Sequence, residues 1–141
     1  MMTINDFPIQ TYITVQWGDM DAFRHVNNVT YVKWGETARI EYFKSIDFFN
    51  SAPEEMEFAP ILGFQSVKYI APVVYPDIIK IGTITEEIKE DRFIMKSYFF
   101  SDTQNKLVAI QTHEIIVFDY KNHQKIPVPN TLKELIKKIE E

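Results

Sequence analysis

The most informative stretch of this sequence runs from residue 15 to residue 39 and reads VQWGDMDAFRHVNNVTYVKWGETAR. Its second half has helical periodicity, which continues to about Asn50. At 100° per residue, apolar or small side chains fall within a stripe about 120° wide, as on a helix with one buried face. Asn27 or Asn28 is a suitable residue type to cap its start. The pattern predicts a long helix over 28–50 whose stripe comprises Tyr31, Trp34, Gly35, Ala38, Tyr42, Ile46 and Phe49.

Strand-like segments flank the predicted helix on both sides. Alternating β-branched and aromatic residues between turn formers indicate strands near residues 9–16, 61–69, 77–89, 92–101 and 106–119. Their connections are short, so these strands have to pair antiparallel. We expect a curved antiparallel sheet wrapped around one central helix, with a bulge or bend at Gly82 and an exposed edge that invites pairing with a second copy. Residues 130–141 predict a short amphipathic C-terminal helix.

The composition narrows the class of protein. A length of 141 residues fits a single domain spanning 1–141, and the lack of cysteine excludes disulfides and thiolate chemistry. A net charge of −5 argues against nucleic acid as a partner. The N-terminus has no signal-peptide pattern, and no apolar run approaches the ~20 residues of a membrane helix. We therefore expect a soluble, cytoplasmic protein without a membrane partner.

Five polar side chains gather in the loop before the predicted helix: Asp19, Asp21, His25, Asn27 and Asn28. The start of a helix offers unpaired N–H groups and a partial positive charge, which suit an anion or a developing oxyanion. A carboxylate a few residues upstream can act as a general base or nucleophile on a carbonyl held there. This combination indicates acyl-transfer chemistry.

Three other interpretations of this loop stay open. Asp19, Asp21 and His25 could ligate a metal ion, although no second cluster at ligand spacing accompanies them. A phosphotransfer aspartate would need an alternating α/β chain, whereas a run of strands follows this helix. The Asp and Asn side chains could also serve only as caps, with His25 packed as a satisfied polar residue.

The order of motifs resembles a known family. An aromatic residue precedes D-x-D, then come H-V-N-N-x-x-Y and E-x-A-R, and the segments YIAPVVYPD and HEIIVFDY follow later. This pattern is similar to that of the hotdog-fold acyl-CoA thioesterases of the 4-hydroxybenzoyl-CoA thioesterase type. The resemblance implies an α+β hotdog fold and hydrolysis of an acyl-CoA without metal or redox cofactor. It also implies a homodimer or homotetramer with its pocket between subunits. An acyl carrier protein thioesterase and a non-catalytic acyl-CoA-binding module are the alternatives.

The same resemblance assigns expected roles to individual residues. Asp21 matches the catalytic carboxylate, as general base or nucleophile, and the backbone N–H of Asn28 matches the donor that polarises the thioester oxygen. His25 is expected to orient water or Asp21, and Asp19 to hold the loop by accepting backbone hydrogen bonds. Many members have glycine where this chain has Arg24. The residues expected to line the substrate site are Asn27, Tyr31, Trp17 and Tyr75, with Trp34 and Tyr69 as further candidates for its walls, while Glu36, Arg39 and His113 are expected to be structural.

Overall fold

The computed structural model describes residues 2–48 and 57–140, and its central element is helix α1, Asn28–Ser45. The helix begins where predicted, because Oδ1 of Asn27 accepts a hydrogen bond from the N–H of Val29 at 3.0 Å. It ends earlier than predicted. Asp47 has a φ of 58°, and the chain turns so that the N–H of Phe48 donates to the carbonyl of Phe43 at 2.8 Å. The last predicted helical residues, 49 and 50, lie outside the described residues.

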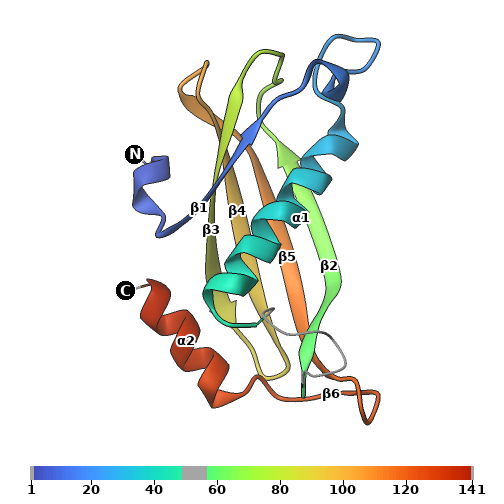
Figure 1. Cartoon of the computed structure of the whole chain (residues 1–141), viewed down its shortest axis with the longest axis vertical. Helices are drawn as coiled ribbons and strands as arrows, with labels where there is room; N and C mark the ends of the chain where they lie inside the picture. Colours follow the sequence, from blue (N-terminus) through green and yellow to red (C-terminus); the bar gives the residue numbers. More distant parts are fainter. Residues whose placement is uncertain (1, 49–56, 141) are drawn as a thin grey trace.

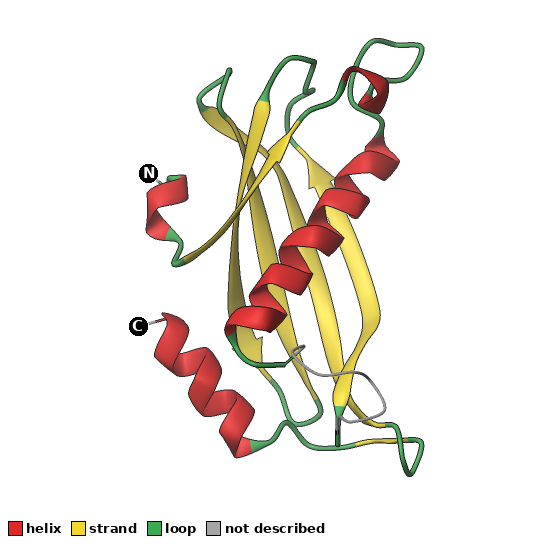
Figure 2. Ribbon diagram, in the orientation of Figure 1, coloured by secondary structure: helices red, strands yellow, loops and turns green. Residues whose placement is uncertain are grey.

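A curled antiparallel sheet wraps around α1 (Figures 1 and 2). Its strands are β1 (Ile9–Thr14), β2 (Ala59–Tyr69), β3 (Ile78–Ile88), β4 (Arg92–Ser101) and β5 (Lys106–Asp119), in the order β1-β3-β4-β5-β2, and the short β6 (Gln124–Lys125) pairs with β5. All five pairings are antiparallel. The bounds predicted for β4 and β5 are confirmed, and the expected curved sheet around one helix is the observed architecture.

The prediction of a bulge at Gly82 is wrong. The pairing registers shift between residues 62 and 64, 85 and 87, and 99 and 100, whereas Gly82 pairs regularly with Gln10 and Tyr98. The reason for glycine here is packing: the buried ring of Phe7 occupies the space that a β-carbon at Gly82 would take. Phe7 follows a short 3₁₀ helix, η1 (Ile4–Asp6), which lies beside the sheet just before β1 (Figure 1).

Two apolar clusters fill the space between α1 and the sheet. The first involves the N-terminal half of α1 and includes Tyr31, Trp34, Ala38, Phe99 and Ala109. The second involves its C-terminal half and includes Tyr42, Phe43, Ile46, Phe93 and Ile115. The C-terminal helix α2, Asn130–Glu140, adds Leu132 and Ile136 to the second cluster, so the amphipathic helix predicted there is present. Neither helix α1 nor α2, within the described residues, is long and apolar enough to cross a membrane.

A hydrogen-bonded chain of polar side chains is buried with these clusters. Arg39, which was expected to be structural, is buried, and it pairs with the exposed Glu36 at 3.6 Å. Its Nη1 donates to Nδ1 of His113 at 3.1 Å. Nε2 of His113 therefore carries the proton and donates to Oγ of Ser97 at 3.0 Å, and that hydroxyl lies 3.0 Å from Oγ1 of Thr83. The chain links α1 to three strands.

Candidate active site

The loop before α1 is held by its own backbone and by Asp19. This residue ends a 3₁₀ helix, η2 (Trp17–Asp19), and its Oδ2 accepts a hydrogen bond from the N–H of Gln16 at 2.8 Å. Its carbonyl accepts another from the N–H of Asn27 at 3.0 Å. Asp19 thus fixes both ends of the loop through backbone hydrogen bonds, which is the role expected of it.

Asp21 lies at an exposed turn in this loop. Its N–H donates to the carbonyl of His25 at 3.0 Å, and its carbonyl accepts from the N–H of Arg24 at 2.9 Å. One carboxylate oxygen, Oδ1, accepts from the N–H of Phe23 at 2.9 Å, which fixes the direction of the side chain. Arg24 has a φ of 64°, in the left-handed region that favours glycine.

The start of α1 has one N–H group that stands apart from its neighbours. The N–H of Val29 is capped by Oδ1 of Asn27, and that of Thr30 donates to the carbonyl of Asn27 at 2.9 Å. The N–H of Asn28 donates to no group among residues 2–48 and 57–140. It also lies at the positive end of the helix dipole. A carbonyl oxygen placed here would meet an unpaired donor in a favourable potential.

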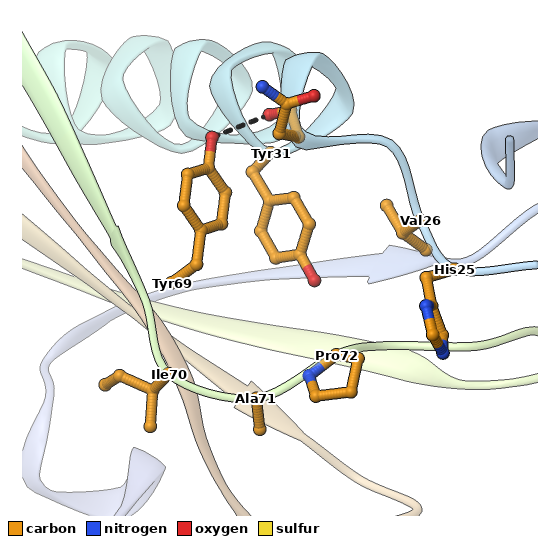
Figure 3. Close-up of a pocket in the computed structure, with 8 residues that line it drawn as sticks. His25, Val26, Tyr31, Tyr69, Ile70, Ala71 and Pro72 are labelled. Carbon is orange, nitrogen blue, oxygen red and sulfur yellow. Dashed lines mark hydrogen bonds between the residues drawn. The ribbon is translucent and has the colours of Figure 1, made fainter. Parts of the chain in front are cut away.

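Asn28 borders a cavity of about 290 Å³ between the start of α1 and the segment that follows β2 (Figure 3). Its lining residues are His25, Val26, Asn28, Tyr31, Tyr69, Ile70, Ala71 and Pro72. The ring of Tyr31 packs edge-on against that of Tyr69, with their centroids 5.1 Å apart. Burial, followed by the proximity of Tyr69, raises the pKa of Tyr31 to about 12, so its hydroxyl stays protonated. The cavity thus has aromatic walls and a histidine, and it is bordered by Asn28, whose N–H has no partner among the described residues.

The structure brings together some of the residues expected from the sequence. His25, Asn28 and Tyr31 line the cavity, as does Tyr69. Five other residues expected at the site do not line this cavity within one chain: Asp21, Asn27, Trp17, Tyr75 and Trp34. Asn27 caps the helix and Trp34 belongs to the first apolar cluster, whereas the Trp17 side chain is 72% exposed and that of Tyr75 is 45% exposed.

Sequence reasoning did not find the wall formed by Ile70, Ala71 and Pro72. The signal available was the proline-bearing segment directly after a strand, because proline stops strand pairing and releases the chain to turn. Here the N–H groups of Ile70 and Ala71 both donate to the carbonyl of Val108, at 2.8 and 3.1 Å, which holds this wall against β5.

Two other features of the described residues bear on the choice of site. No three His, Asp or Glu side chains in residues 2–48 and 57–140 lie close enough together to hold a metal ion. A larger cavity, about 560 Å³, lies between the N-terminal segment and the turn from β4 to β5, where Lys80, Phe100 and Lys106 are among its lining residues. It touches neither the polar loop nor the start of α1, so the smaller cavity is the candidate active site.

Comparisons with known proteins identify relatives of this chain. Residues 15–136 match the model of the Thioesterase-like superfamily. The chain is 21% identical to the long-chain acyl-CoA thioesterase FadM of Escherichia coli (strain K12) over 131 residues, which cover 93% of this chain and 98% of that protein.

Solved structures share the fold. A thioesterase from Thermus thermophilus, crystallised with coenzyme A and Zn, superimposes with a TM-score of 0.80 at 24% identity, covering 96% of either chain. The DHNA-CoA thioesterase from Staphylococcus aureus superimposes with a TM-score of 0.78 at 20% identity, covering 93% of this chain and 89% of that one. The curled sheet around α1 is thus the hotdog fold. With the family match spanning most of its length, the chain belongs to the Thioesterase-like superfamily and is a thioester hydrolase.

Proposed function

We propose that this chain hydrolyses an acyl-CoA thioester to a free acid and CoA, with Asp21 as general base or nucleophile and the N–H of Asn28 as the oxyanion contact. The observation that carries the proposal is that Asn28, whose N–H has no partner among the described residues, lines a cavity with aromatic walls. Membership of a thioesterase family and the likeness to FadM, an acyl-CoA thioesterase, support the substrate class.

The chemistry follows from where charge develops. As the thioester carbonyl is attacked, its oxygen becomes negative, and the helix N-terminus with the N–H of Asn28 stabilises that charge. Asp21 either removes a proton from the attacking water or attacks the carbonyl carbon itself. In the second route water then hydrolyses the acyl-aspartate anhydride. The C–S bond breaks in either case, and CoA leaves as a thiolate that takes up a proton. His25, in the cavity wall, is suited to orient the water.

We propose further that the site is completed by a second copy, in a homodimer or homotetramer. Asp21 does not line the cavity that Asn28 borders in one chain. β2 ends the sheet order, and its edge carries exposed apolar side chains, Leu62 and Phe64. Tyr69 and Ile70, at the cavity, are also about half exposed. An edge of this kind is suited to pair with another chain.

The test of the chemistry is thiol release from a panel of acyl-CoA thioesters, both aliphatic of varied chain length and aromatic, with an acyl carrier protein thioester included. Asn28→Pro removes the N–H in question together with the side chain, and proline is well accommodated at the first position of a helix. We expect a loss of about 10²–10³ in kcat for this variant. Asn28→Ala keeps the N–H and should retain most of the activity.

Equal activity of these two variants would contradict the oxyanion contact. If the wild-type chain binds acyl-CoA tightly but hydrolyses no thioester in the panel, it is a binding module instead. For the shared site, Asp21→Asn and Asn28→Pro chains are mixed and allowed to exchange subunits. Recovery of activity in the mixture supports a site built from two chains, whereas a monomeric mass in solution contradicts it.

A further inference from the structure

The last residue of β2 is fastened directly to the first residue of α1. The hydroxyl of Tyr69 donates a hydrogen bond of 2.9 Å to the backbone carbonyl of Asn28, and Figure 3 shows this contact at the edge of the cavity. The two residues are 41 positions apart in the chain. Within residues 2–48 and 57–140, no other side chain of the sheet bonds to Asn28.

The contact acts on the same residue that carries the proposed oxyanion donor. The other hydrogen bonds at the helix start are local: Asn27 caps Val29 and Thr30, and neither bond ties the helix to the sheet. Neighbouring Val26 donates to the carbonyl of Val73 at 2.8 Å, which fixes the loop but not the helix. Tyr69 is therefore the hydrogen-bonded brace between the first turn of α1 and the sheet, in addition to the packing of Tyr31 against Phe99 of β4.

The brace is itself held in place. The Tyr69 ring packs edge-on against Tyr31, whose side chain is buried in the first apolar cluster. Two torsions position a tyrosine hydroxyl, and contact with a buried ring restricts both. Burial also raises the pKa of Tyr69 above its usual value, so the hydroxyl remains a donor.

We propose that Tyr69 is a positioning residue for the Asn28 N–H, acting through the Asn28 carbonyl rather than on the substrate. The inference rests on the proposed function and deepens it. A preorganised donor stabilises a transition state only while it is held at the right place, because errors of about 0.5–1 Å reduce catalysis steeply. Loss of the brace should therefore lower kcat and leave KM nearly unchanged.

The test starts with Tyr69→Phe, which keeps the ring and removes the hydroxyl. We expect kcat to fall roughly 5- to 30-fold, as for the loss of one positioning hydrogen bond, with KM within about 2-fold of wild type. Tyr12→Phe is the matched control. Its hydroxyl also makes one hydrogen bond, to Gln10 at 3.0 Å, but it lies on β1 away from the cavity, so its kcat should stay at the wild-type value.

A double-mutant cycle separates positioning from direct contact with the substrate. If Tyr69 acts through Asn28, its replacement has almost no effect on kcat once Asn28→Pro has removed the N–H. If the full loss persists in the Asn28→Pro background, Tyr69 acts on the substrate and the proposal is overturned. A rise in KM at unchanged kcat overturns it as well.

Hydrogen exchange gives a readout that needs no activity. Amides of the first turn of α1, residues 29–32, should exchange several-fold faster in Tyr69→Phe than in Tyr12→Phe, and equal exchange overturns the brace. The two possible failures are distinct. A wild-type chain that hydrolyses no thioester overturns the proposed function, whereas an active wild type with unchanged Tyr69→Phe kinetics overturns the role of Tyr69 alone.

Discussion

The amide of Gln111 on β5 occupies the space that Gly35 leaves open on the buried face of α1. A β-carbon at Gly35 would overlap the Gln111 side chain. Gln111 is fully buried, and its Nε2 donates to Oε1 of Gln65 on β2 at 3.0 Å. Helix α1 therefore approaches the sheet closely at this point only because residue 35 has no side chain.

Gly35→Ala should lower the free energy of unfolding by about 1–3 kcal/mol, the usual cost of overpacking a tight core. The Gln111 amide would have to move and give up its bond to Gln65. Urea-induced unfolding measures the change.

Gly18→Ala is the control for Gly35→Ala, because a β-carbon there meets no atom within 4 Å. It should change stability by less than about 0.5 kcal/mol. In a Gln111→Ala background, Gly35→Ala should lower the free energy of unfolding by less than it does in the wild-type chain. A Gly35→Ala variant as stable as wild type would show that the helix can shift at no cost.

Asp21→Asn should lower kcat by about 10²–10⁴, the range expected for a positioned base or nucleophile. Asparagine keeps the size of the side chain and its acceptor for the N–H of Phe23, so the loop should stay folded. Thiol release under saturating substrate is the measurement. Asp102→Asn, in the turn after β4, removes another exposed carboxylate, which pairs with Lys80, and should leave kcat unchanged. Full activity in Asp21→Asn would remove this residue from the mechanism.

Arg24→Gly should raise the free energy of unfolding by roughly 0.5–1 kcal/mol. The φ of 64° strains any residue with a β-carbon, and the relief outweighs the greater freedom of glycine in the unfolded chain. Arg24→Ala removes the charged group but keeps the β-carbon, so it should bring no such gain. Thermal and urea unfolding measure the stability of both variants. Equal stabilities of Arg24→Gly and Arg24→Ala would mean that the strain is negligible.

Stability should fall as the pH is lowered from about 6.5, because of His113. Burial, and next the Arg39 guanidinium, lowers the pKa of His113 to about 3 from an unfolded value of 6.5. Between these values the unfolded state binds the extra proton and the folded state does not, so the free energy of unfolding decreases with acidity by up to about 1.4 kcal/mol per pH unit.

Urea unfolding at intervals between pH 5 and 7.5 measures how the free energy of unfolding changes with pH. Most carboxylates titrate below this range and so contribute little to the change. His113→Gln should lose the slope between pH 5 and 6.5 whatever its absolute stability. His123→Gln, in an exposed turn, should keep it. A wild-type stability independent of pH in this window would contradict the neutral buried state of His113.

Local pattern alone was enough to predict much of the fold. The periodicity of residues 28–50 predicted the helix, which ends earlier at Ser45, and most of its buried face, and alternation predicted the bounds of β4 and β5. These features depend on spacing along the chain, which a sequence contains in full. The polar loop before α1 was found in the same way, because a helix start and its capping residues are adjacent in sequence.

Contacts between distant segments were not predictable in this way. Arg39 is buried because it meets His113, 74 residues away, and Gly82 is small because Phe7 lies over it. The wall of the cavity after β2 and the bond from Tyr69 to Asn28 arise only once β2 takes its place at the end of the sheet.

The sequence by itself therefore determined the elements, the helix start and the acidic loop that make a thioesterase recognisable. The tertiary structure alone decided which of those residues border one cavity and what holds the Asn28 N–H in position. The physical reason is that helix caps and periodic faces depend on neighbours in sequence, whereas burial and bracing depend on the order of strands in the sheet.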